Sequence, residues 1–434
     1  MKLSNIHSRQ GPARLMGILA GAALALILSV AGGFADNAAA KAANGPKAYV
    51  GLFKDNAVAV IDTANNSVLA RISVPTGPHG MVITPDGRWV YVSSDGDSKV
   101  SVIDARTDSV AAAIEVGTSP HGLAITPDGR LVLAAVFGTS SVAFIDTASR
   151  TGVGRLPAGN PHNIALSPDG RTAYTAAQAK GGLGLAILDV AGRAQTGFVP
   201  LDKMPRALSV SPDGKRVYFT VAGSDAVQVL DTSSKAIVNQ IAVGASPHLP
   251  LATPDGKRVL VVAQGPGELY ILDAAAARVS ARLAVGDLPH WIALTPDGRR
   301  AWITNEGSND LSLVDLGSAT KIATIPVGNA PRKIVVQPGA AVSSLASPPE
   351  AAVPTRISGF AFDDTVAVTA GGSVTWTNAD PVPHTVTSDT GLWASGEIAA
   401  GARFSMRFTT PGRYGYHCEM HPSMQGTVIV KSAA

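Results

Sequence analysis

The sequence predicts an all-β protein in two parts, a seven-bladed β-propeller followed by a small β-sandwich. Two marks recur with a shared period through the first three quarters of the 434 residues. One is Pro-Asp-Gly, spaced by 41 to 44 residues, and the other is an aliphatic pair followed by Asp, spaced by 42 or 43. Two independent marks with one spacing indicate a repeat protein. The turn prolines are Pro85, Pro127, Pro168, Pro212, Pro254, Pro296 and the degenerate Pro338, and the aspartates are Asp62, Asp104, Asp146, Asp189, Asp231, Asp273 and Asp315.

Each period contains four short strands and has the length of one propeller blade. In the first complete period the predicted strands are 80–84, 89–93, 99–104 and 109–116. The Pro-Asp-Gly turn joins the first two, because Pro presets φ and Gly accepts a positive φ. Four strands in about 42 residues correspond to one blade.

The two ends of the repeat region together complete the seventh blade. The first repeat segment, 48–50, matches the second strand of a blade, and the last, 333–336, matches the first strand. Pairing these ends would protect the edges that an open sheet exposes. The propeller is therefore predicted to span residues 47–339.

The repeat resembles a known family. Gly77-Pro78-His79-Gly80, Pro85-Asp86-Gly87 and Val90-Tyr91-Val92 are similar to the YVTN-type propeller repeat of exported bacterial proteins. The resemblance implies the fold and says little about function, since propellers serve as lactonases, reductases, adhesins and scaffolds.

The N-terminal segment is predicted to be a secretory signal peptide. Lys2, Arg9 and Arg14 precede an apolar run at 15–30, and small residues follow. This order predicts a signal peptide over residues 1–35, with cleavage up to five residues later. An uncleaved membrane anchor is the alternative, but the run is short for a bilayer-spanning helix. We expect a periplasmic or secreted protein with no stable membrane span after cleavage.

Charge gives no indication of a nucleic-acid partner. The first 35 residues hold three of the 35 basic residues and none of the 32 acidic ones, so the remainder carries 32 of each sign. A formally neutral chain without a basic stripe is not expected to bind nucleic acid.

One position in every repeat carries a side chain suited to binding. It lies six residues before the turn proline, always follows Pro, and begins the innermost strand, so all seven copies should ring one mouth of the central channel. Imidazoles are common metal ligands and guanidiniums bind anions, so the ring could hold an additional metal or an anionic substrate. The alternative is that His belongs to the repeat and caps the strand locally. The ring residues are His79, His121, His162, Arg206, His248, His290 and Arg332.

A linker and a second domain follow the repeats. Residues 340–354 are rich in Ala, Ser and Pro, which is typical of a linker, and the 42-residue period ends there. Residues 355–434 alternate between apolar and polar positions as antiparallel strands do, which predicts a β-sandwich.

The second domain contains the ligand types of a mononuclear copper site. Cys418, His421 and Met424 follow at intervals of three residues, and His384 lies upstream. One thiolate, two imidazoles and one thioether form the ligand set of a type 1, or blue, copper centre. Cys418 is the single cysteine. It cannot form an intramolecular disulfide, and metal binding accounts for a lone thiol in an exported chain.

This region resembles the plastocyanin and amicyanin cupredoxins along its whole length. The resemblance implies a Greek-key sandwich with one type 1 copper, bound by His384, Cys418, His421 and Met424. It rests on Phe360-Ala-Phe362, Gly372-x-Val374-x-Trp376-x-Asn378, Pro383-His384-Thr-Val386 and Gly412-x-Tyr414-x-Tyr416-x-Cys418.

Two positions depart from the cupredoxin pattern, and two further residues are assigned no ligand role. Asp363 replaces a common Pro, and Thr385 stands where Asn is common, which could alter a hydrogen bond behind the copper ligands. We interpret His417 as pointing away from the metal, because neighbouring strand residues face opposite sides. We also prefer Met424 to Met420 as the axial ligand.

The sequence predicts an electron-transfer protein whose propeller is a docking or scaffold domain. The expected partner is a redox protein such as a c-type cytochrome or another cupredoxin. One alternative is a copper-dependent periplasmic reductase or oxidase with a second site at the propeller ring. Its architecture resembles nitrous oxide reductase, although that enzyme's cupredoxin needs two cysteines. Another alternative is a lactonase-like or binding propeller with an accessory copper domain. We favour the carrier over a catalyst; if the ring is catalytic, a homodimer is expected.

Overall fold

The computed structural model describes residues 46–338, 353–363, 365–370, 372–390, 393–408 and 411–432. Every regular element in these ranges is a β-strand. Within the same ranges no helix is long and apolar enough to cross a membrane. The predicted signal peptide and most of the predicted linker lie outside the described residues.

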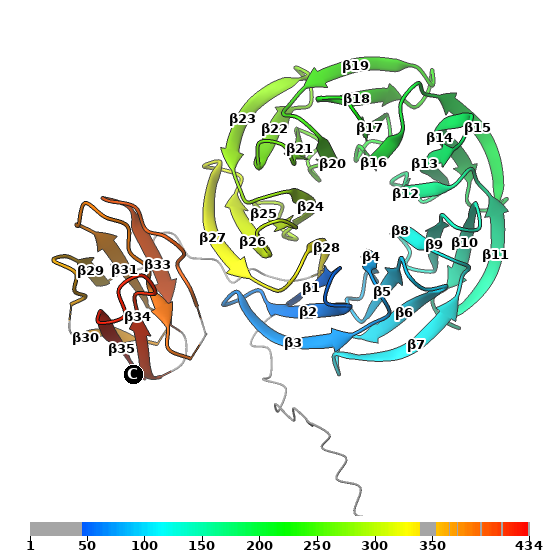
Figure 1. Cartoon of the computed structure of the whole chain (residues 1–434). Coiled ribbons are helices and arrows are strands. Elements are labelled where there is room, and N and C mark those ends of the chain that lie inside the picture. The colour runs from blue at the N-terminus through cyan, green and yellow to red at the C-terminus, as the bar shows by residue number, and fades with distance from the viewer. Residues whose placement is uncertain are drawn as a thin grey trace, which may run out of the picture. The chain divides into compact units, whose positions relative to one another are not determined.

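The repeats form a ring of seven four-stranded antiparallel sheets, as predicted (Figure 1). In each blade the first strand of the repeat lies innermost and the fourth lies at the rim. From inside to outside, the strands of the blades are β4 (Pro78–Ile83), β5 (Trp89–Ser94), β6 (Lys99–Asp104) and β7 (Ser109–Glu115); β8 (Pro120–Ile125), β9 (Leu131–Val136), β10 (Ser141–Asp146) and β11 (Thr151–Pro157); β12 (Pro161–Leu166), β13 (Thr172–Ala179), β14 (Gly182–Asp189) and β15 (Ala194–Pro200); β16 (Pro205–Val210), β17 (Arg216–Val221), β18 (Ala226–Asp231) and β19 (Ile237–Ala242); β20 (Pro247–Ala252), β21 (Arg258–Ala263), β22 (Glu268–Asp273) and β23 (Arg278–Ala284); β24 (Pro289–Leu294), β25 (Arg300–Asn305), β26 (Asp310–Asp315) and β27 (Thr320–Pro326); and β28 (Pro331–Val336), β1 (Lys47–Leu52), β2 (Ala57–Asp62) and β3 (Ser67–Ser73).

The seventh blade joins the two ends of the repeat region, as the sequence indicated. β28 pairs antiparallel with β1, with Tyr49 opposite Val335. Outside the ladder, Gln337 accepts a hydrogen bond from the Lys47 amide at 2.8 Å through Oε1. It also donates one from Nε2 to the Gly87 carbonyl of the next blade at 2.8 Å. Closure thus depends on both backbone pairing and one bridging amide.

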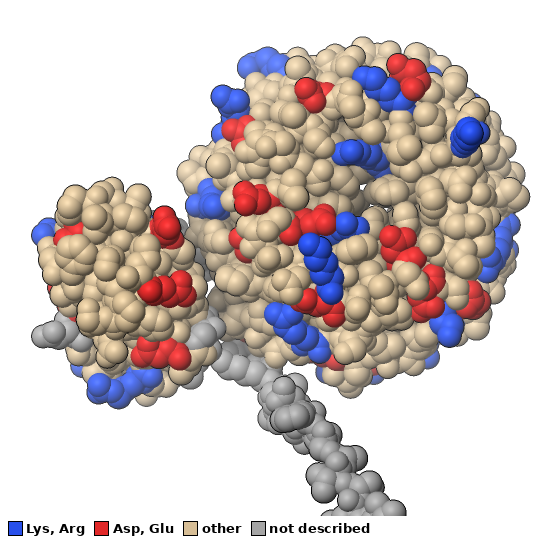
Figure 2. All heavy atoms as spheres, in the orientation of Figure 1, with Lys and Arg blue, Asp and Glu red and all other residues tan. Residues whose placement is uncertain are grey.

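The propeller core lies between neighbouring blades. All of β1 and β2 except Lys47 is buried, because both faces of these strands pack against other sheets. Tyr49 and Val58 of the seventh blade share one apolar cluster with Met81 and Val90 of the first. The rim strands are largely exposed, and Lys or Arg side chains alternate with Asp or Glu over the face seen in Figure 2.

A hydroxyl before the proline completes each of the six Pro-Asp-Gly turns. Asp86 Oδ1 accepts hydrogen bonds from Thr84 Oγ1 at 2.5 Å and from the Arg88 amide at 3.0 Å, while Gly87 has a φ of 70°. The Thr84 hydroxyl holds the pKa of Asp86 below its ordinary value. The same contact recurs at Thr126–Asp128, Ser167–Asp169, Ser211–Asp213, Thr253–Asp255 and Thr295–Asp297.

The C-terminal region forms a sandwich of two sheets. One contains β29 (Val353–Ile357), β31 (Ser373–Asn378) and β33 (Arg403–Arg407), and the other contains β30 (Thr365–Thr369), β35 (Gln425–Lys431), β34 (Gly412–His417) and β32 (Thr387–Ser388). β29 begins two residues before the expected domain boundary at 355. The pairs β29–β31 and β30–β35 are parallel, which alternation alone could not distinguish from the expected antiparallel pairing. Ile357, Trp376, Tyr416 and Val428 are fully buried between the sheets.

Replacing Thr126 with Val should destabilise the propeller by about 1–3 kcal/mol. The Thr126 hydroxyl donates to Asp128 at 2.6 Å and accepts from the Leu131 amide at 3.0 Å, and the isosteric Val removes both hydrogen bonds and leaves the Leu131 amide without its partner. Thr151→Val on a rim strand, where the hydroxyl is exposed, is the matched control and should change stability by less than about 0.5 kcal/mol. Equal urea midpoints for the two variants would contradict the assigned role of the turn hydroxyl.

Candidate metal centre

The loop between β34 and β35 brings three sulfur- or nitrogen-bearing side chains together. The Cys418 amide donates to the Met424 carbonyl at 3.1 Å, and the Met424 amide donates to the His421 carbonyl at 2.9 Å. The His421 amide in turn donates to the Cys418 carbonyl at 3.3 Å. These bonds wind the loop into tight turns, so residues spaced by three face one side.

A second loop, between β31 and β32, positions His384 opposite Cys418. Asn378 is fully buried, and its Nδ2 donates to the carbonyls of Val382 and Ile398, both at 2.8 Å. His384 forms a backbone bridge with Ile398 and has no exposed surface. The side-chain amide of Asn378 therefore shapes the loop that carries His384.

The two imidazoles and the thiol have the separations expected around one ion. Cys418 Sγ lies 3.8 Å from His384 Nδ1 and 3.6 Å from His421 Nδ1. One coordinating atom from each residue lies within 4.8 Å of the other two. Nitrogen and thiolate ligands at about 2.0 and 2.3 Å from an ion, spread at 120°, would stand about 3.7 Å apart. The donor set fits a first-row transition metal.

The two candidate axial methionines differ in burial. Met424 is 2% exposed and packs in the same apolar cluster as Cys418, whereas Met420 is 38% exposed. His417 is also directed away from the cluster, since its Nδ1 pairs with Asp389 at 2.7 Å. The structure thus brings His384, Cys418 and His421 together with buried Met424 nearby.

Asp380 fixes the orientation of His384, and the sequence analysis missed it. His384 Nε2–H donates to Asp380 Oδ2 at 2.9 Å, which leaves the Nδ1 lone pair directed at Cys418. Backbone amides of Phe360 and Gly359 hold the pKa of Asp380 below its ordinary value. The position four residues before a predicted ligand was the available signal, because metal-binding histidines commonly donate their other nitrogen to a carboxylate.

Thr385 connects the two ligand loops. Its amide donates to Cys418 Sγ at 3.3 Å, and its hydroxyl accepts from the Glu419 amide at 2.8 Å. The residue that departs from the family pattern therefore still supplies a hydrogen bond to the sulfur and adds one to the loop beyond it.

An exposed aromatic ring covers both imidazoles. Phe360 is 52% exposed and meets His384 and His421 edge-on, with ring centroids 5.5 and 5.0 Å apart. Its φ of 58° places it at the tip of a tight turn. In the sequence, Phe360 was distinguished only as part of the cupredoxin pattern.

The propeller ring gathers at one mouth of the channel, as predicted, but in two groups. His79 lies 4.8 Å from His121 and 5.5 Å from His162 between ring centroids, and His248 and His290 form a second close pair at 4.0 Å. The two groups meet where the His79 and His290 rings lie edge-on at 6.3 Å. The two arginines have their own partners: Arg206 Nη1 donates to Ser246 Oγ at 3.1 Å, and Arg332 Nη2 donates to Glu306 Oε1 at 2.9 Å.

Four of the ring histidines, His79, His162, His248 and His290, are held in the neutral form. Burial lowers the pKa of His162 to about 4 and that of His248 to about 3, and nearby cationic groups add to the effect. The same causes place the pKa of His79 and His290 well below the ordinary value. Neutral imidazoles keep a lone pair free for a metal ion.

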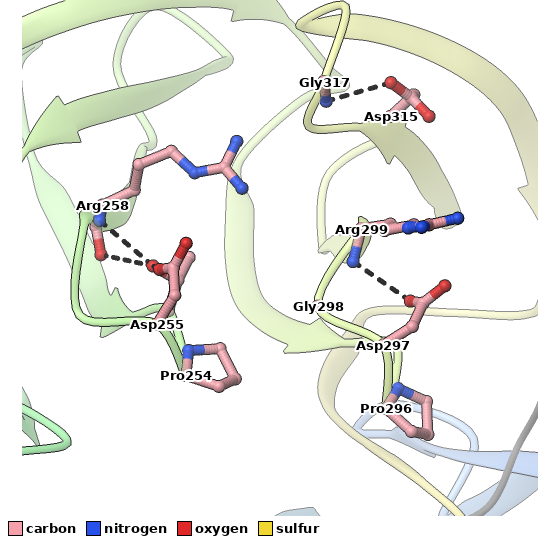
Figure 3. Close-up of a pocket in the computed structure, with 10 residues that line it drawn as sticks. Pro254, Asp255, Arg258, Pro296, Asp297, Gly298, Arg299, Asp315 and Gly317 are labelled. Atoms are coloured by element: carbon pink, nitrogen blue, oxygen red, sulfur yellow. Dashed lines mark hydrogen bonds between the residues drawn. The ribbon is translucent and has the colours of Figure 1, made fainter.

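A surface hollow lies at the opposite end of the innermost strands, between the turns of the fifth and sixth blades (Figure 3). Its carboxylates are engaged by their own turns: Asp255 accepts from the Lys257 amide and Asp297 from the Arg299 amide, each at 3.0 Å. These carboxylates stabilise their own turns. The hollow therefore has a structural role, unlike the histidine-bearing mouth of the channel.

Comparison with known proteins supports the two folds separately. A family model for the cupredoxin-like domain matches residues 362–430, and one for the cytochrome D1 heme domain matches residues 48–179. Amicyanin-alpha of Methylorubrum extorquens is 35% identical over 71 residues, which cover 15% of this chain and 60% of that protein. Plastocyanin of Scenedesmus fuscus is 35% identical over 79 residues, covering 15% and 81%. The chain spans only 53–60% of the length of the first three curated relatives it matches.

Solved structures share the propeller fold at low identity. Hydrazine synthase of Kuenenia stuttgartiensis is 21% identical with a TM-score of 0.57, covering 62% of this chain and 91% of that one. A dihydro-heme d1 dehydrogenase is 18% identical with a TM-score of 0.52, covering 67% and 75%. At these identities the likeness concerns the fold alone.

Replacing His248 with Gln in metal-free protein should reduce the amount by which the free energy of unfolding falls on acidification. The folded pKa of about 3 lies below the ordinary 6.5, so the neutral ring stabilises the fold above pH 6.5, and this contribution is lost as pH falls toward 3. Between pH 7 and pH 4 the variant should lose about 1–3 kcal/mol less than the parent. Thermal unfolding over this range measures the slope, and parallel curves would contradict a buried neutral His248.

Proposed function

The chain belongs to the cupredoxin family through its C-terminal sandwich, and on that premise we propose that it is an exported type 1 copper protein that carries single electrons. The observation that supports this most directly is the fully buried Cys418 thiol with two imidazole nitrogens at 3.6 and 3.8 Å. In this proposal His384, Cys418, His421 and Met424 hold the metal.

The ligand set suits a metal that changes charge by one. Copper bound there would supply a one-electron couple, with thiolate favouring Cu(I) and imidazole accommodating Cu(II). Cys418 receives the Thr385 amide, and Asp380 holds His384 by its outer nitrogen. Such partners keep ligands in place when the oxidation state changes, which favours fast transfer.

The apolar surface beside His421 is the proposed docking surface for a redox partner. Phe360 packs against the His421 ring and is 52% exposed. Met420, the residue before His421, is 38% exposed. A small apolar surface over a partly exposed metal ligand suits brief contact with a partner such as a c-type cytochrome or another cupredoxin. The propeller is proposed to dock or scaffold that partner.

Replacing Cys418 with Ser should abolish the visible absorption of the copper-loaded protein. The colour of a blue copper centre arises from thiolate-to-copper charge transfer, and Ser supplies no thiolate. Met420→Leu is the control and should keep full absorbance per copper. An intense visible band that persists in the serine variant would overturn the assignment.

Replacing Met424 with Leu should keep copper bound and raise the reduction potential. A weak axial thioether stabilises Cu(II), and the apolar Leu removes that donor. Met420→Leu provides the matched comparison, because that side chain is exposed. Redox titration followed at the visible band measures both, and a shift confined to the Met420 variant would identify the wrong axial ligand.

A further inference from the structure

The first three blades place three imidazoles within reach of one ion at the channel mouth. One ring nitrogen each of His79, His121 and His162 lies within 4.8 Å of the other two. Three nitrogens bound tetrahedrally at 2.0–2.1 Å would stand about 3.3 Å apart, so small side-chain rotations would close the group around an ion.

The backbone at the ring permits this close approach because the adjoining residues lack side chains. A Cβ built on Gly80 would lie 2.0 Å from the His121 carbonyl oxygen, and one on Gly122 would lie 2.8 Å from the Asn163 Cα. Neither position tolerates a larger residue without movement of backbone. Glycine after two of the three histidines therefore brings neighbouring innermost strands together at the level of the imidazoles.

Hydrogen bonds on the outer side of two rings leave a lone pair available on each. His121 Nε2–H donates to Asp95 Oδ1 at 2.5 Å, which makes its Nδ1 an acceptor. That Nδ1 is buried and has no hydrogen-bond partner among the described residues. His162 Nδ1–H donates to the Arg206 carbonyl at 3.2 Å, which leaves Nε2 as its acceptor. A buried acceptor without a donor is costly, and a cation would satisfy it.

The carboxylate behind His121 is not a product of repeat copying. In every blade the residue at the equivalent position donates a hydrogen bond from its backbone amide to the carbonyl of the residue before the ring proline. The side chains at this position differ between blades, and Asp95 supplies a carboxylate that orients His121, one of the clustered histidines. The equivalent residues are Phe53, Asp95, Phe137, Gln178, Ala222, Gln264 and Glu306.

We propose that His79, His121 and His162 bind a divalent transition metal ion, with Cu²⁺ or Zn²⁺ as the ions their chemistry favours. Imidazole suits both ions, and Cu²⁺ binds most tightly in the divalent series. Three protein ligands leave a coordination position open to water or a small ligand. Asp95 is a positioning residue in this site. His248 and His290 pack against each other at 4.0 Å, and His290 meets His79 only at 6.3 Å between ring centroids, with its Nε2 facing Glu306 at 3.9 Å.

Metal stoichiometry of the full chain tests the site. Metal-free protein is titrated with Cu²⁺, with the visible band reporting the sandwich site and equilibrium dialysis reporting total copper. The parent should bind two copper ions, the second without adding to the band and with nitrogen splitting in its EPR signal. Zn²⁺ should compete for this second equivalent. One copper in total, with no bound Zn²⁺ beyond the sandwich site, would overturn the proposal.

Variants distinguish the proposed ligands from the rest of the ring. His162→Ala should lose the second equivalent while keeping the visible band and the parent's thermal unfolding transition, which together show that both domains are folded. His121→Gln is the second variant if the first fails to fold. His248→Ala should keep two ions. Asp95→Asn should weaken the second Kd by about 10–100-fold while leaving the stoichiometry at saturation unchanged. A second equivalent that survives both triad variants, or is lost with His248, would overturn the assignment. Failure of the sandwich to give a visible band would overturn the electron-carrier proposal alone.

Discussion

The antiparallel pairing of β28 with β1 is the constraint on which the propeller depends. It joins the last repeat strand to the first and closes the chain of sheets into a ring, so neither end of the repeat region is left unpaired. In a closed ring all seven innermost strands run in the same sense along the channel. Residues that begin those strands must therefore meet at one mouth, although they are more than 40 residues apart in sequence.

Repeat periodicity predicted the propeller and the histidine ring. It did not predict that the ring histidines gather in two groups. Every ring residue follows Pro and precedes a turn by six positions, and that spacing alone places it at the mouth. Which histidines come together depends on features that break the sevenfold pattern, such as Gly80 and Gly122 beside the ring and Asp95 behind it. These contacts join different blades, so no local pattern reveals them.

In the sandwich, the spacing of Cys418, His421 and Met424 was equally readable, because one loop holds all three. Asp380 was not recognised as part of the site although it lies four residues before His384, and the role of Phe360 arises because a distant turn meets that histidine. The first strand also began earlier than composition suggested, because Val353 and Pro354 pair with β31 although they read as linker. The types of the ligand residues can be predicted from the sequence. The contacts between Phe360 and these ligands join separate loops and cannot be predicted in this way.

The two histidine clusters share one feature and differ in their other ligands, and that difference separates their expected chemistry. In each, a carboxylate fixes the outer nitrogen of one imidazole and leaves the inner nitrogen as an acceptor. The sandwich adds a buried thiolate and thioether, which complete the ligand set and leave no position for substrate. The propeller cluster offers three imidazole nitrogens, so an ion there would keep an open position. Under the two proposals, the closed site would pass electrons and the open one would bind a small molecule, which would give the two domains different tasks.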